Sequence, residues 1–233
     1  LNNLVVAQGW QAGYLALMVF TAAGGLLAYL MMPFELSGNA APIRKRPARE
    51  DFAAILRHRV FWVLAVSMLL CNLPQAIILS QLNLILSEFG VTGRAASIMV
   101  SSYAIGMMLG RFISGYALDR FPPRIVATLG LLLSGFGILG LGLTGGSIIW
   151  LSVAVLAIGL SFGAESDIIA FLIYRHFGGR IYSTVHGLTS SMVAVSATIG
   201  AALLAIVLHV TDAYLPFLMG TGLCVLAGGL LLL

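Results

Sequence analysis

Seven long apolar stretches constrain this chain more than any other feature of its sequence. The hydrocarbon core of a bilayer is about 30 Å thick and a helix rises about 1.5 Å per residue, so one span needs about 20 apolar residues. Transmembrane strands would instead show short alternating segments, which the sequence lacks. The sequence therefore predicts an all-α, polytopic membrane protein with seven transmembrane helices, at 10–32, 60–87, 95–117, 125–144, 148–174, 185–209 and 214–233.

The distribution of positive charge predicts how these spans are oriented. Eleven of the twelve Lys and Arg residues lie in or beside three alternate connections, and only Arg94 belongs to the other side. The positive-inside rule places the Arg-rich connections in the cytoplasm. We therefore expect the first residue outside and the last inside, in a membrane that we expect to be the bacterial inner (plasma) membrane.

The connection at 33–59 is the only long one, and it is rich in proline and charge. It predicts a cytoplasmic linker that leads into a short surface helix at 48–58. Residues 1–32 then form the last helix of a preceding half, and residues 60–233 form a six-helix domain. This layout is expected of the back of a twelve-helix protein built from two six-helix halves. The chain begins with Leu1 and ends inside its last span, so we expect a truncated chain whose N-terminal half is a missing partner.

Two motifs resemble signatures of the major facilitator superfamily. Gly115-Tyr-Ala-Leu-Asp119-Arg120-Phe-Pro-Pro-Arg124 resembles the loop G-x-L-A-D-R-x-G-R-[RK] between the second and third helices of each half, with Ala117 and Pro122-Pro123 as departures. The run from Arg175 through Gly178 and Arg180 to Gly187 resembles the turn between the fourth and fifth helices. Gly9-Trp10 opens the first span, so the resemblance covers nearly the whole chain. The resemblance implies a secondary transporter, not an enzyme, that moves a small molecule by alternating access.

In that family the signature loop helps to close the cytoplasmic gate. The resemblance implies a gate and charge network made of Gly115, Asp119, Arg120, Arg124, Asp167 and Arg175. We expect Asp119 near the start of the following helix, where the helix dipole favours a carboxylate. The alternative is a solvated turn that only satisfies the positive-inside rule.

Arg111 lies eight residues before Asp119, and therefore about 12 Å deeper along a helix. In relatives such as the oxalate:formate antiporter and the monocarboxylate transporters, an arginine four residues before the motif glycine contacts a substrate carboxylate. Arg111 has this spacing to Gly115. The resemblance therefore implies an organic anion as substrate, with Arg111 as ligand; a gate role for Arg111, and a drug or sugar exporter, remain alternatives.

Carboxylates and amides inside other spans are further candidates. Glu165 should either pair with Arg111 or the Arg120 loop, or carry a proton and act as a coupling site. Pro74 should kink the second span near Asn72 and Gln75, which are candidate substrate ligands.

Other functional classes fit the sequence less well. No His or Cys spacing indicates a metal or cofactor site, and Gly159-Leu-Ser161-Phe-Gly163 lies in mid-span rather than at the strand-to-helix turn of a serine hydrolase. Lys45, the only lysine, lies in a loop and so cannot hold retinal inside a span. A seven-helix receptor remains the alternative from another class, and we expect no nucleic acid partner.

Overall fold

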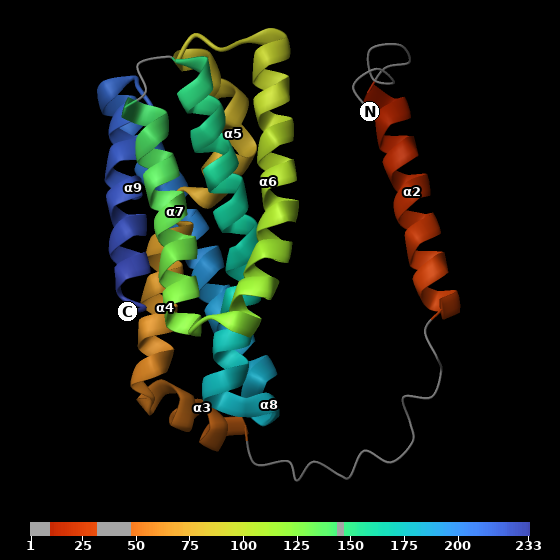
Figure 1. Ribbon diagram of the computed structural model, residues 1–233, viewed down its shortest axis with the longest axis vertical. Coiled ribbons are helices and arrows are strands. Elements are labelled where there is room, and N and C mark those ends of the chain that lie inside the picture. Colours follow the sequence, from red (N-terminus) through yellow and green to blue (C-terminus); the bar gives the residue numbers. More distant parts are fainter. Residues whose placement is uncertain (1–9, 32–47, 144–146) are drawn as a thin grey trace. The chain divides into compact units, whose positions relative to one another are not determined.

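The computed structural model describes residues 10–31, 48–143 and 147–233, and all elements in these ranges are helices (Figure 1). The chain divides into two compact units, Leu1–Arg46 and Pro47–Leu233, which are described separately. The first unit contains helix α2 (Trp10–Met31). Helix α2 is long and apolar enough to cross a membrane, as predicted for 10–32. Gly9 and most of the linker, including Lys45, lie outside the described residues.

The second unit is a helical bundle. A short helix α3 (Ala48–Arg57) comes first, close to the surface helix predicted at 48–58. The remaining helices are α4 (Arg59–Asn72), α5 (Gln75–Glu88), α6 (Gly93–Arg120), α7 (Pro123–Leu143), α8 (Ile148–Thr211) and α9 (Leu215–Leu230). They follow the six predicted spans, and the result is the all-α polytopic architecture that the sequence predicted.

Helices and spans do not correspond one to one. Helices α4 and α5 together form one long apolar segment, Arg59–Glu88. Helix α8 has 64 residues and is interrupted at Gly178 (φ 70°, ψ 173°), a conformation open to glycine and strained for other residues. Its first arm (148–177) and second arm (179–211) correspond to two predicted spans. Helix α9 has 16 residues and is shorter than the predicted span at 214–233.

The predicted proline break lies between α4 and α5. Helix α4 ends at Asn72 and α5 begins at Gln75, on either side of Leu73 and Pro74. Proline lacks the N–H that would continue the helical ladder. The second arm of α8 packs against this break at Gly200. A Cβ at this position would overlap the carbonyl oxygen of Leu73, so the absence of a side chain allows the close approach. Ser196 adds a hydrogen bond from its hydroxyl to the carbonyl oxygen of Leu69.

Helix α6 packs closely on the first arm of α8 through two pairs of glycines. Gly106 and Gly110 face the backbone of α8, and Gly159 and Gly163 face the backbone of α6. A Cβ at Gly106 would lie 2.9 Å from the carbonyl oxygen of Leu156. Lipid tails give no hydrophobic drive for helices to associate, so such close backbone contact is a main source of packing energy. It fixes the helix that carries Arg111 against the helix that carries Glu165.

Helix α3, the α6–α7 connection and the bend in α8 lie at one end of the bundle (Figure 1). We call this end the basic end, because Arg120, Arg124, Arg175 and Arg180 belong to its connections. Helix α3 is attached there by Ile55, which is fully buried, and by an ion pair of 3.6 Å between Asp51 and Arg180.

Candidate functional site

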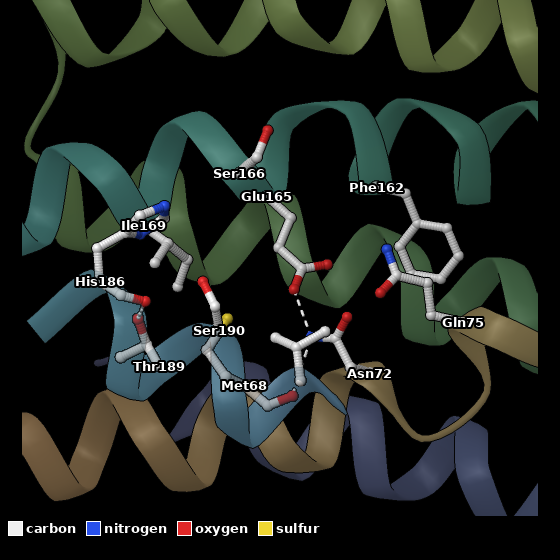
Figure 2. Close-up of a pocket in the computed structure, with 11 residues that line it drawn as sticks. Met68, Asn72, Gln75, Phe162, Glu165, Ser166, Ile169, His186, Thr189 and Ser190 are labelled. Carbon is white, nitrogen blue, oxygen red and sulfur yellow. Dashed lines mark hydrogen bonds between the residues drawn. The ribbon is translucent and has the colours of Figure 1, made fainter. Parts of the chain in front are cut away.

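A pocket of about 180 Å³ lies between α4, α5 and the two arms of α8. We call it the Glu165 pocket (Figure 2). Helix α4 contributes its last turns, α5 its first residue, and the two arms of α8 face each other across the pocket. Its lining residues are Met68, Asn72, Gln75, Phe162, Glu165, Ser166, Ile169, His186, Thr189, Ser190 and Val193.

Glu165 is the most buried ionisable group that lines this pocket, with 6% of its surface exposed. The side-chain amide of Asn72 donates one hydrogen bond to Glu165 Oε1, at 2.5 Å, and another to the carbonyl oxygen of Met68, at 2.9 Å. Both amide N–H groups of Asn72 are thus used, and the amide is held in one orientation. Glu165 Oε2 is buried and has no hydrogen-bond partner.

The proline break explains how Asn72 reaches Glu165. Asn72 is the last residue of α4, immediately before Leu73 and Pro74, and it is 1% exposed. Glu165 lies in the middle of the first arm of α8, 93 residues further along the chain. The break therefore places a rigid hydrogen-bond donor opposite the carboxyl group at the level where α4 stops.

The structure pairs Glu165 with an amide and not with an arginine. The expected ion pair from Glu165 to Arg111 or to the Arg120 loop is absent from the described residues, where the carboxyl group accepts a hydrogen bond from Asn72. Arg111 is exposed on α6 and does not line the pocket. The lining contains no lysine or arginine, and His186 is its only other titratable side chain.

His186 is a residue of the pocket that the sequence did not single out. Its Nδ1 is buried without a hydrogen-bond partner, and its ring stacks on that of Tyr182 with centroids 5.5 Å apart. Together with Thr189 and Ser190 it forms a polar stripe at helical spacing on the second arm of α8. That spacing was visible in the sequence and could have identified this wall of the pocket.

The candidate ligands Asn72 and Gln75 are both among the residues that line the pocket. Asn72 is held by its bond to Glu165, whereas Gln75 is half-buried at the start of α5. The structure thus brings two of the three predicted substrate-binding residues to Glu165. Arg111, the third, lies outside this group.

Most residues of the predicted gate network lie toward the basic end, whereas Asp167 lies near the middle of the first arm of α8; no ion pair joins these described residues to one another. Asp119 is exposed in the last turn of α6, which corrects the expectation that it lies near the start of the following helix. Phe121 precedes Pro122 and is extended (φ −118°, ψ 158°), as residues before proline tend to be, so α6 ends at Arg120 and α7 begins only at Pro123.

Of the three arginines of this network, Arg120 lies over an aromatic ring and the other two are exposed. The Arg120 guanidinium lies 4.6 Å from the centroid of the Tyr116 ring, and Arg124 is exposed at the start of α7. Gly115 is exposed on α6, where a Cβ would meet nothing within 4 Å. Asp167 accepts a long hydrogen bond of 3.5 Å from Ser166, and Arg175 is exposed near the end of the first arm. Among the described residues, the ion pair at this end joins Arg180 to Asp51.

The architecture and the pocket define a class of protein: a polytopic helical membrane protein with an acidic pocket inside its bundle. Residues 64–233 match the family described as the Major Facilitator Superfamily, which is most of the chain. The chain therefore belongs to the major facilitator superfamily, a family of transporters. No curated protein matches it significantly.

Proposed function

We propose that this protein is a secondary active transporter that moves a small molecule by alternating access, with the Glu165 pocket in its translocation path. The observation that carries the proposal is the buried Glu165 carboxyl group in the lining of the pocket, which is held by Asn72 on one oxygen and has no hydrogen-bond partner on the other. Substrate sites in such transporters lie near the middle of the membrane, between repeated bundles. Membership of the family also favours a transporter over a seven-helix receptor.

Glu165 is the proposed proton-coupling group. An ionised carboxylate is costly to bury without a cation, and the lining of the pocket contains no lysine or arginine. A pocket closed to water therefore favours the neutral carboxyl group, whereas a pocket open to water permits ionisation. Proton binding and release then depend on which side of the membrane the pocket faces, which is the requirement for coupling.

A small organic anion, such as a carboxylate, is the proposed substrate class. The spacing of Arg111 to Gly115 supports it, because a planar guanidinium can bind a carboxylate through two parallel hydrogen bonds. Proton uptake by Glu165 would remove a negative charge that repels such an anion, so proton and anion would move together. Arg111 is exposed on α6 and is free to meet a ligand held outside the described pocket.

Export of a lipophilic cationic drug is the second candidate. The pocket combines one carboxyl group with apolar side chains such as Met68, Phe162 and Ile169, and it contains no lysine or arginine. A cation could bind directly to Glu165 and displace its proton. In this case proton and substrate would move in opposite directions.

Substrate screening on the full-length protein in proteoliposomes tests these alternatives. Radiolabelled carboxylates and lipophilic cations would be compared with an imposed pH gradient, for the native protein, Arg111→Lys and the matched control Arg94→Lys at the opposite end of α6. We expect carboxylate uptake that Arg111→Lys weakens at least tenfold and Arg94→Lys leaves unchanged. Cation transport that is indifferent to Arg111→Lys would refute the anion proposal and support the second candidate.

The basic end of the bundle is the proposed cytoplasmic face, and Asp119 with its neighbouring arginines is the proposed gate. Asp119 is exposed and forms no ion pair within the described residues, so its carboxylate is available to a cation of an N-terminal half. Asp119→Asn should then shift the protein toward states open on the basic side. Labelling of a cysteine at position 120 or 124 by a membrane-impermeant reagent, from outside or inside intact cells, tests the orientation.

A further inference from the structure

A second cavity opens along the bundle between α6 and α7, with the first arm of α8 as its floor. Its volume is about 460 Å³, and we call it the α6–α7 groove. Ile113, Ala117 and Phe121 of α6 form one wall and Ile125, Leu129 and Leu133 of α7 form the other. The groove does not include any residue of the Glu165 pocket.

Small side chains account for the depth of the groove. Ala117 of α6, Gly130 of α7 and Ala164 of α8 are small residues of the lining, where larger side chains would fill the space between the helices. Both α6 and α7 pack extensively on α8, so α8 holds them in place while a gap remains between them.

The polar groups of the groove are already satisfied within the protein. The Ser161 hydroxyl donates to the carbonyl oxygen of Gly130 at 2.6 Å, and the Ser114 hydroxyl donates to the carbonyl oxygen of Arg111 at 3.0 Å. A molecule bound in the groove therefore need not form hydrogen bonds with these hydroxyl groups. An apolar chain fits such a surface better than a polar transported solute.

The length of the groove matches one leaflet of a bilayer. It extends from Gly110 to Phe121 on α6, which is about 16 Å along a helix. The hydrocarbon core is about 30 Å thick, so the groove covers about half of it. One end lies deep in the bundle and the other lies at the basic end.

One arginine, Arg120, immediately precedes the groove residue Phe121 at the basic end of α6. Arg120 follows Ile113 by seven residues and Ala117 by three, so it lies on the same face of α6 as the wall of the groove. Its guanidinium lies over the Tyr116 ring and forms no ion pair with a described acidic residue. A phosphate group at the membrane surface would complement this charge.

We propose that the α6–α7 groove binds an anionic phospholipid, with one acyl chain along the groove and the phosphate of its headgroup at Arg120. The length and the apolar lining of the groove favour an acyl chain, and the unpaired Arg120 favours an anionic headgroup. A lipid bound there would bridge the signature loop and the helix pair α6–α7, and so stabilise one position of the loop.

Photo-crosslinking with lipids that carry a diazirine in the acyl chain tests the proposal on the full-length protein in nanodiscs. Phosphatidylglycerol and phosphatidylcholine probes would be compared in the native protein, and the labelled peptides identified by mass spectrometry. We expect labelling between residues 110 and 133, with about a fivefold preference for phosphatidylglycerol, the effect of one arginine near an anionic surface.

Two variants, each with a control, test the acyl-chain contact and the headgroup contact separately. Ala117→Phe should fill the groove and reduce labelling by both lipids, whereas Ala201→Leu on the exposed surface of α8 should not. Arg120→Gln should abolish the preference while Arg94→Gln keeps it. Thermal unfolding of each variant in detergent verifies folding. Equal labelling by both lipids in the native protein, or labelling that Ala117→Phe does not change, would overturn the proposal.

Discussion

Replacing Gly163 by alanine should loosen the contact between α6 and α8 on which the site depends. A Cβ at this position would overlap the carbonyl oxygen of Met107, which belongs to the backbone of α6 and cannot rotate away. Ordinary contact begins at 3.4 Å, so the two helices must separate. Overpacking of this kind costs about 1–3 kcal/mol.

Two other glycines provide a graded comparison. At Gly106 the Cβ would lie 2.9 Å from the carbonyl oxygen of Leu156, which is 0.5 Å short of ordinary contact at 3.4 Å. The helix propensity of alanine, favourable by up to about 1 kcal/mol over glycine, should largely offset this smaller strain. At Gly187 nothing lies within 4 Å, so Gly187→Ala should be neutral or stabilising by about 0.5–1 kcal/mol.

Thermal unfolding of the three variants in one detergent gives the assay. The expected order of unfolding temperature is Gly187→Ala highest, then Gly106→Ala, then Gly163→Ala well below the native protein. Gly163→Ala should also reduce transport, because separation of α6 from α8 displaces Arg111 relative to Glu165. A Gly163→Ala protein as stable as Gly187→Ala would refute the packing argument.

Three further changes test individual contacts by thermal unfolding. Gly178→Ala should destabilise by about 1–3 kcal/mol, because φ 70° with ψ 173° strains any side chain, and an unchanged unfolding temperature would contradict the bend. Asp51→Asn removes a partly exposed ion pair of 3.6 Å and should cost less than about 1 kcal/mol, so a large loss would indicate that α3 is attached mainly by charge. Ser196→Ala removes a buried hydrogen bond to the carbonyl oxygen of Leu69 and should cost about 1 kcal/mol, and no loss would contradict that contact.

The course of the helices could be predicted from the sequence because local rules decide it. Apolar length predicted the spans, and Pro74 predicted an interruption of the second span. The contact of α6 with α8 through paired glycines is a finding of the structure. The position of Asp119 also follows from a local rule. The residue before Pro122 is extended, so the helix ends at Arg120 and keeps Asp119 in its last turn.

The partner of Glu165 could not be predicted because it depends on tertiary packing. Charge alone favoured an arginine, but Arg111 lies on a face of α6 that does not border the pocket. Asn72 reaches the carboxyl group because the proline break ends α4 at that level and because the second arm of α8 packs against the break. His186 joins them only after the bend at Gly178 folds that arm back.

The direct test of the proposed coupling is substrate-driven proton movement in proteoliposomes that contain the full-length protein and an internal pH dye. Glu165→Gln preserves the shape and the contact with Asn72 but removes the titrating group, and Asp212→Asn at an exposed helix end is the matched control. We predict that Glu165→Gln abolishes proton movement while substrate exchange continues, and that Asp212→Asn behaves like the native protein. Native proton movement in Glu165→Gln would contradict the account.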